Sequence, residues 1–221
     1  MHIGFIGGIG PAATVAYYDR TVRAFQDANL KLNLTIDHAD VGVLVKNAQA
    51  EARREQAEVF AKHLNQLHAA GCDVAAITAL TGHFCFDELA QISPLPLISA
   101  ISPIDRFCVN NGVTTVGILG SPPVMASHLF GQLQETKSVI PSSETEKLGQ
   151  TYFEMAIKGV CSEEARAAFF AAGAEMVSKQ SADAVLLAGT DLGLAFDGHD
   201  PGFPIIDALD IHVDEFVSTA L

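Results

Sequence analysis

The chain contains the same local pattern twice, 110 residues apart. Asp73 and Asp183 each precede an apolar run of four residues, and a small residue, Ala79 or Gly189, follows six positions after each Asp. Apolar runs of this length are typical of strands that are buried on both faces of a parallel sheet. Ligands of such sheets bind in loops at the carboxyl ends of the strands. The pattern therefore predicts two similar units whose two loops frame one small-molecule site.

Strands and helices are expected to alternate along both halves of the chain. The expected strands are 2–6, 32–36, 74–78, 97–100, 115–119, 184–188 and 204–206. Expected helices span 50–70, 84–90 and 208–221. Three others are expected from their first residues: one begins at Pro11, one runs from a capping box at Ser143 and Glu146 to about Lys158, and one begins at a cap on Ser162. This alternation predicts parallel sheets covered by helices on both faces.

The internal resemblance extends beyond the two loops. Residues 3–8 resemble residues 116–121, so the chain restarts its pattern near the middle. The expected fold class is therefore α/β, with two similar parallel-sheet domains related by pseudo-twofold symmetry and a ligand cleft between them. We expect a first domain of residues 1–104 plus 208–221, to which the last helix returns, and a second domain of residues 105–207.

Composition excludes several classes of partner. The formal net charge is −13, and both nucleic acids and anionic membranes select basic surfaces. The longest stretch without a charged residue, 107–134, contains turn residues and does not resemble a membrane span. We see no signal peptide, and the four cysteines lack the CxxC spacing of metal or redox sites. The sequence thus predicts a cytoplasmic protein with reduced cysteines and no metal site.

Three motifs together make the chain similar to the aspartate/glutamate racemase family. They are Gly7-Gly8-Ile9-Gly10-Pro11 after the first strand, Thr78 to His83, and Ala188 to Leu192. The family has a Gly-Gly-x-Gly-Pro loop, one catalytic cysteine in Pro-Cys-Asn-Thr-x-His and a second in Gly-Cys-Thr-Glu/Asp. The resemblance covers essentially the whole chain. It implies cofactor-independent chemistry, in which one thiolate removes the α-proton and the opposite thiol returns a proton to the carbanion.

The chain departs from the family at both cysteines. Ala79 and Gly189 occupy those positions, and neither side chain can transfer a proton. The neighbouring residues that keep the family's side chains are Thr81, His83, Thr190 and Asp191. The resemblance then implies a racemase or related isomerase with substituted groups. Its catalytic candidates are His83, whose unperturbed pKa would lie near 6.5, and Asp191 or Thr190 opposite.

The resemblance also implies a ligand and the groups that hold it. The ligand would be a small carboxylate or amino acid, bound by Gly8, Ile9, Thr81, Ser121 and Thr190. Because Ala79 and Gly189 are small, we expect a wide cleft floor that admits a bulkier or more apolar ligand than aspartate. Relatives often form dimers, so the resemblance favours a homodimer.

Three alternatives to racemisation remain open. A decarboxylation or elimination at the same cleft would need one acid rather than two, and a binding protein would need none. In the third, Gly8-x-Gly10-x-x-Ala13 matches a dinucleotide fingerprint, with Asp37 where a ribose-binding acid would stand. Two similar halves argue against the third, because a dinucleotide enzyme needs one complete dinucleotide domain and a different substrate domain. His83 could also simply cap the helix expected from Phe84.

Overall fold

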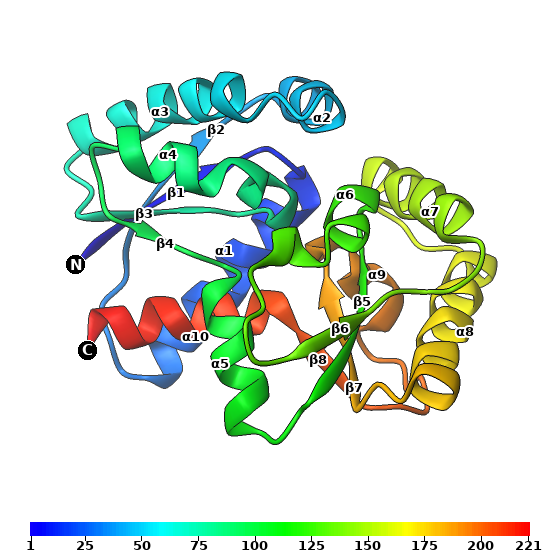
Figure 1. The fold of residues 1–221 in the computed structure, drawn as a ribbon. Helices are drawn as coiled ribbons and strands as arrows, with labels where there is room; N and C mark the ends of the chain where they lie inside the picture. Colours follow the sequence, from blue (N-terminus) through cyan, green and yellow to red (C-terminus); the bar gives the residue numbers. More distant parts are fainter. The chain divides into compact units, whose positions relative to one another are not determined.

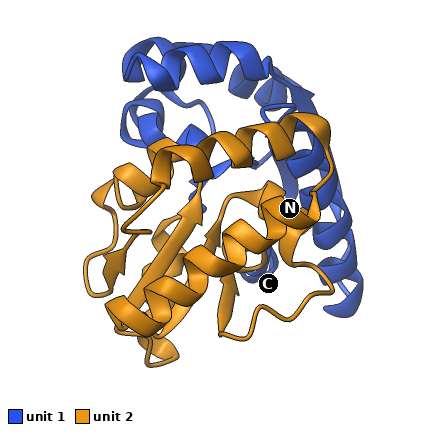
Figure 2. Cartoon of the chain, turned by 90° about the vertical axis from the view of Figure 1, so that its right-hand side faces the viewer, with its two compact units in different colours: residues 1–100, 212–221 blue, residues 101–211 orange.

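A computed structural model describes residues 1–221 as two compact units (Figures 1 and 2). Unit 1 comprises residues 1–100 and 212–221, and unit 2 comprises residues 101–211. The C-terminal segment belongs to unit 1, where the rings of Phe216 and Phe5 pack at a centroid distance of 5.2 Å.

Unit 1 is a four-stranded parallel sheet with helices around it (Figure 1). The strand order is β2-β1-β3-β4, and the strands are β1 (His2–Gly7), β2 (Asn33–His38), β3 (Val74–Ile77) and β4 (Leu97–Ile98). The helices are α1 (Pro11–Asp27), α2 (Val41–Gln49), α3 (Arg53–Ala69), the 3₁₀ helix η1 (Leu80–Cys85), α4 (Phe86–Ile92) and the end of α10 (Ala208–Ala220).

Unit 2 repeats this topology with the strand order β6-β5-β7-β8, again all parallel. Its strands are β5 (Thr115–Gly120), β6 (Lys137–Val139), β7 (Ala184–Ala188) and β8 (Ile205–Asp207). Its helices are α5 (Ser102–Asn110), α6 (Pro122–Ala126), η2 (Leu129–Gly131), α7 (Thr145–Lys158), α8 (Glu163–Gln180), η3 (Thr190–Leu192) and α9 (Gly193–Phe196). The predicted α/β class with two similar parallel sheets is confirmed.

The two repeated aspartates fix the sheets at the amino ends of their strands. Asp73 accepts the backbone N–H of His2 at 2.7 Å. Asp183 accepts the N–H groups of Thr114 and Thr115 at 2.8 and 3.0 Å. The bonds from Thr115 and Thr114 lower the pKa of Asp183, because they stabilise its ionised form. Each carboxylate thus ties the strand that follows it to the neighbouring central strand.

Two helix starts show how local signals succeed and fail. Ser162 caps α8 as expected, accepting the N–H of Ala165 at 3.1 Å. The capping box at Ser143 and Glu146 is wrong. Helix α7 begins at Thr145 after Glu144, whose φ of 53° is left-handed, and no side chain caps it. No helix of either unit has the length and hydropathy that would let it cross a membrane.

Candidate functional site

Ala79 and Gly189 stand at equivalent points of the two units. Each is the last extended residue between a central strand and a 3₁₀ helix, with φ/ψ of −158°/128° at Ala79 and −160°/119° at Gly189. The carbonyl of each accepts an N–H three residues later, from Gly82 at 3.1 Å and from Leu192 at 2.9 Å. This shared geometry supports the alignment that pairs Ala79 with Gly189.

In unit 1, His83 binds the backbone through both ring nitrogens. The N–H of Ala100 donates to Nε2 at 2.9 Å, so Nδ1 carries the proton and donates to the carbonyl of Ala79 at 3.0 Å. The ring is 1% exposed and stacks on Phe86 at 5.2 Å. Burial lowers the pKa of His83 to about 4, so the imidazole is neutral. A ligand would have to displace one of these bonds to reach it.

In unit 2, Asp191 and Thr190 present polar atoms that no residue satisfies. Asp191 Oδ1 and Thr190 Oγ1 are both buried without a hydrogen-bond partner. Asp191 Oδ2 accepts the hydroxyl of Tyr152 at 3.3 Å. Burial raises the pKa of Asp191, against the lowering effect of that bond. An unsatisfied buried polar atom costs about 1–3 kcal/mol. The hydrogen bonds within the unit therefore do not account for this pair.

The space beside Gly189 is filled. A Cβ on Gly189 would lie 2.6 Å from the hydroxyl oxygen of Tyr152 and 2.7 Å from its Cε2 atom. The expected wide floor is therefore wrong at this position, since the tyrosine occupies the volume that a side chain at 189 would take. The physical reason is a long-range contact, because Tyr152 comes from α7 and not from the strand-end loop.

The other predicted binding residues follow the neighbouring central strands. Ser121 is buried at the start of α6, directly after β5, and Gly120 pairs with Ala188 in the sheet. Gly8 and Ile9 follow β1. The N–H of Gly8 is already donated to the hydroxyl of Thr14 at 2.9 Å.

The predicted residues fall into two groups, one per unit. Gly8, Ile9, Thr81 and His83 belong to unit 1, whereas Ser121, Thr190 and Asp191 belong to unit 2. Within each group the residues follow adjacent central strands, at the edge where parallel sheets bind ligands. That both groups contact one ligand stays a prediction.

Comparison with known proteins assigns this geometry to a family. A sequence model of the Asp/Glu/hydantoin racemases matches residues 6–216. The chain belongs to this family. The racemase-family assignment inferred from the three motifs is therefore confirmed, and it extends over both units.

Solved structures with a similar fold include three racemases or racemase homologues. An aspartate racemase homologue from Pyrococcus horikoshii is 23% identical with a TM-score of 0.81, covering 99% of this chain and 98% of its own. The aspartate racemase of Picrophilus torridus is 18% identical with a TM-score of 0.76, covering 100% and 94%. The glutamate racemase of Campylobacter jejuni is 14% identical with a TM-score of 0.64, covering 100% and 86%. At these identities the likeness shows the shared fold.

The dinucleotide alternative gains no support from the same loops. Asp37, the expected ribose ligand, is hydrogen-bonded to Nδ1 of His63 at 2.8 Å. The N–H of Gly8, which would face a pyrophosphate, is bonded to Thr14. The two sheets share one topology, which leaves no distinct substrate domain.

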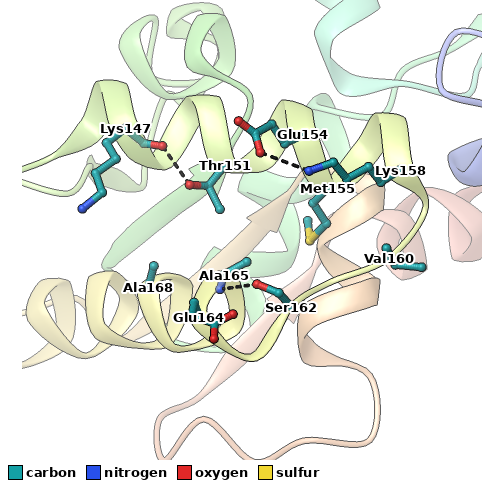
Figure 3. A pocket seen from close by; sticks show the side chains of 10 residues that line it. All are labelled: Lys147, Thr151, Glu154, Met155, Lys158, Val160, Ser162, Glu164, Ala165 and Ala168. Carbon is teal, nitrogen blue, oxygen red and sulfur yellow. Dashed lines mark hydrogen bonds and ion pairs between the residues drawn. The ribbon is translucent and has the colours of Figure 1, made fainter.

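Two surface pockets lie elsewhere in unit 2, between α7 and α8. Figure 3 shows the larger of them. The larger one measures about 380 Å³ and is lined by Lys147, Thr151, Glu154, Met155, Lys158, Val160, Ser162, Glu164, Ala165 and Ala168. Lys158 pairs with Glu154 at 3.3 Å across one helical turn. None of the predicted site residues lines either pocket.

Sequence reasoning missed Tyr152. The residue lies in an expected helix and carries no motif, and its partner Asp191 is in a distant loop. The structure gives the sign of this contact: Gly189 is a glycine although its φ of −160° is extended. A glycine that backbone conformation does not require indicates that another group approaches closely.

Proposed function

We propose that this racemase-family protein binds a small amino acid and transfers a proton at its α-carbon, without a cofactor and without the two-thiol pair. The observation that carries the proposal is the unsatisfied pair at the end of β7. A buried carboxylate oxygen of Asp191 and the hydroxyl of Thr190 both lack a hydrogen-bond partner. Polar groups of this kind at the carboxyl end of a parallel strand are suited to hold a small polar ligand.

The two groups suit the two ends of an amino acid. When Asp191 is ionised, its Oδ1 atom can only accept hydrogen bonds. An ammonium group can donate such a bond. The Thr190 hydroxyl can donate to a carboxylate. The desolvation that raises the pKa of Asp191 would be offset when a cation binds beside it. These features favour an amino acid over a simple carboxylate.

The chemistry is expected to be asymmetric. Unit 1 offers Ala79 in place of a thiol, and both nitrogens of its neutral His83 bind the backbone. We infer that His83 holds its loop in place rather than transferring the proton. Two-base racemisation needs acid–base groups on both faces of the α-carbon. The state of His83 therefore favours, as a second candidate, a lyase reaction such as decarboxylation, which needs a single acid.

The test is proton NMR of L-aspartate, then of L-glutamate, incubated with the protein in D₂O. We expect the α-proton signal to disappear, and the rate to fall by at least about 100-fold in Asp191→Asn, which keeps the shape but removes the charge. The matched control is Asp200→Asn, an exposed carboxylate of the same unit that caps a turn. It should exchange at the wild-type rate.

The same spectra separate the alternatives. New resonances from a shortened product would identify a decarboxylase. Line broadening of the ligand with no exchange over a day would identify a binding protein and reject proton transfer. Neither broadening nor exchange with both amino acids would reject the proposed ligand class.

A further inference from the structure

The phenol of Tyr152 packs against the residue that the motif resemblance aligns with the family's second cysteine. That residue is Gly189, and a side chain on it would meet the Tyr152 hydroxyl, Cε2 and Cζ atoms at 2.6, 2.7 and 2.9 Å. Real Cβ atoms do not approach other atoms so closely. Because the extended backbone of Gly189 accommodates any residue, the glycine is required here by space alone.

Helix α7 holds the tyrosine in this position. Tyr152 is 6% exposed, and its neighbours Leu148 and Met155 on the same helical face are buried. One turn earlier, a Cβ on Gly149 would collide with the ring of Pro122, so the helix lies directly against the loop that follows β5. The helix thus passes over the carboxyl ends of both central strands of unit 2, and its tyrosine is pinned there.

The Tyr152 hydroxyl is hydrogen-bonded to Asp191 and can donate a proton. It donates to Asp191 Oδ2 at 3.3 Å, while Asp191 Oδ1 and Thr190 Oγ1, the two unsatisfied atoms, belong to the same loop. Burial and the adjacent carboxyl group raise the pKa of Tyr152 well above its ordinary value. The phenol is therefore protonated at neutral pH, which makes it a proton donor and not a base.

We propose that the Tyr152 hydroxyl, positioned by Asp191, is the proton-donating group of this strand end and replaces the missing second thiol. This inference rests on the proposed function. The Asp191 carboxylate accepts the departing α-proton and later releases it to water, whereas departure of carbon dioxide needs no such acceptor. Either departure leaves an electron pair on the α-carbon of the bound amino acid. The Tyr152 O–H bond breaks, a C–H bond forms at that carbon, and a phenolate remains. The phenolate regains its proton from water, and buffer neutralises the hydroxide.

Replacing the hydroxyl alone tests the proposal. Tyr152→Phe keeps the ring that fills the space beside Gly189, and the matched control is Tyr18→Phe on the exposed face of α1. We expect α-hydrogen exchange of L-aspartate or L-glutamate in D₂O to slow by roughly 100-fold or more in Tyr152→Phe. Ligand line broadening and the thermal midpoint should remain near wild type. Exchange at the wild-type rate in Tyr152→Phe would overturn the inference while leaving the proposed function standing.

A second measurement covers a wild-type protein that exchanges neither amino acid. The tyrosines are labelled with ¹³C at Cζ, and the Tyr152 resonance is assigned by its absence in Tyr152→Phe. If that resonance shifts when L-aspartate or L-glutamate is added, Tyr152 contacts the ligand although the proposed reaction fails. If it does not shift and the wild type shows no exchange, the inference is rejected together with the activity.

Discussion

The hydroxyl oxygen of Tyr152 lies 2.6 Å from the point that a Cβ on Gly189 would occupy. The two residues come from different elements, α7 and the loop after β7, and they exclude one another's side chains. A side chain at position 189 therefore overpacks this space unless Tyr152 moves or is replaced by a smaller residue. The side chain of Tyr152, from α7, thus fills the space that a side chain at position 189 of the strand-end loop would take.

The first prediction follows from this exclusion. Gly189→Ala should lower the free energy of unfolding by about 1–3 kcal/mol, because the new methyl group overpacks the space held by Tyr152. Adding Tyr152→Ala to this variant should remove most of the penalty specific to position 189. Urea unfolding of the two single variants and the double variant gives the coupling energy.

Two variants control this prediction. Gly42→Ala is the matched glycine, because its Cβ would meet only the Asp40 side chain, at 3.1 Å. Tyr152→Phe should not rescue Gly189→Ala, since the ring carbons at 2.7 and 2.9 Å remain. Additive effects of Gly189→Ala and Tyr152→Ala would show that the two side chains do not compete for one space.

The second prediction concerns the seating of α7. A Cβ on Gly149 would collide with the ring of Pro122, which is too rigid to move aside. Gly149→Ala should therefore lift α7 from the strand ends, lower stability by about 1–3 kcal/mol and slow α-hydrogen exchange together. Ala174→Gly serves as a stability control, because Ala174 is an exposed residue of the neighbouring α8 that lines neither pocket between α7 and α8. Unchanged exchange in Gly149→Ala would show that the position of α7 is not critical.

The third prediction is that Asp191→Asn raises stability at pH 7 but removes activity. Burial raises the pKa of this carboxyl, so the folded state holds a proton at pH values where the unfolded state has lost it. Ionised Asp191 therefore destabilises the fold above its folded pKa, and this penalty disappears as pH falls towards the unfolded pKa near 3.8. Asp191→Asn should be more stable than wild type at pH 7, by about 1 kcal/mol.

Urea unfolding at pH 7 and at pH 4 checks this prediction. The stability difference between Asp191→Asn and wild type should shrink at pH 4, while exchange activity is lost at both values. If Asp191→Asn were less stable than wild type at pH 7, the ionised Asp191 carboxylate would not destabilise the fold, and the prediction would be wrong.

The sequence was sufficient for the repeated parts of the fold. Buried strands such as 184–188 carry their signal in a few consecutive residues, and the observed β7 has those bounds. The cap at Ser162 is likewise local. By contrast, α7 begins at Thr145 because Glu144 adopts a left-handed conformation, which no cap motif signals. Patterns carried by a few neighbouring residues are readable, whereas a helix start that depends on one residue's left-handed backbone is not.

The candidate site shows the same limit. Asp191 and Thr190 were identifiable because they adjoin the strand that positions them. Tyr152 was not, because its role depends on how α7 crosses the strand ends. His83 was recognised from its motif, but its bonds to Ala79 and Ala100 arise from the folded loop and from the end of β4. The residues near a site can thus be predicted from the sequence, whereas their protonation states and hydrogen-bond partners depend on the folded structure.

The fourth prediction concerns two buried histidines of unit 1. His83 and His212 lie with ring centroids 6.2 Å apart, and His212 accepts the Tyr17 hydroxyl at 2.9 Å and donates to the carbonyl of Ile98 at 3.2 Å. Burial lowers the pKa of His83 to about 4 and that of His212 to about 3. Both are neutral in the native state, while in the unfolded chain they take up protons below about pH 6.5.

Stability should therefore be complete above pH 6.5 and fall as pH drops towards 4, by up to about 1.4 kcal/mol per pH unit for each histidine. His212→Asn keeps an acceptor for Tyr17 but cannot be protonated in this range. It should be less stable at pH 7 and show a shallower loss between pH 6.5 and pH 4, whereas exposed His68→Asn should follow wild type. Urea unfolding at several pH values gives these slopes. A slope in His212→Asn equal to that of wild type would mean that the buried pair does not govern acid stability.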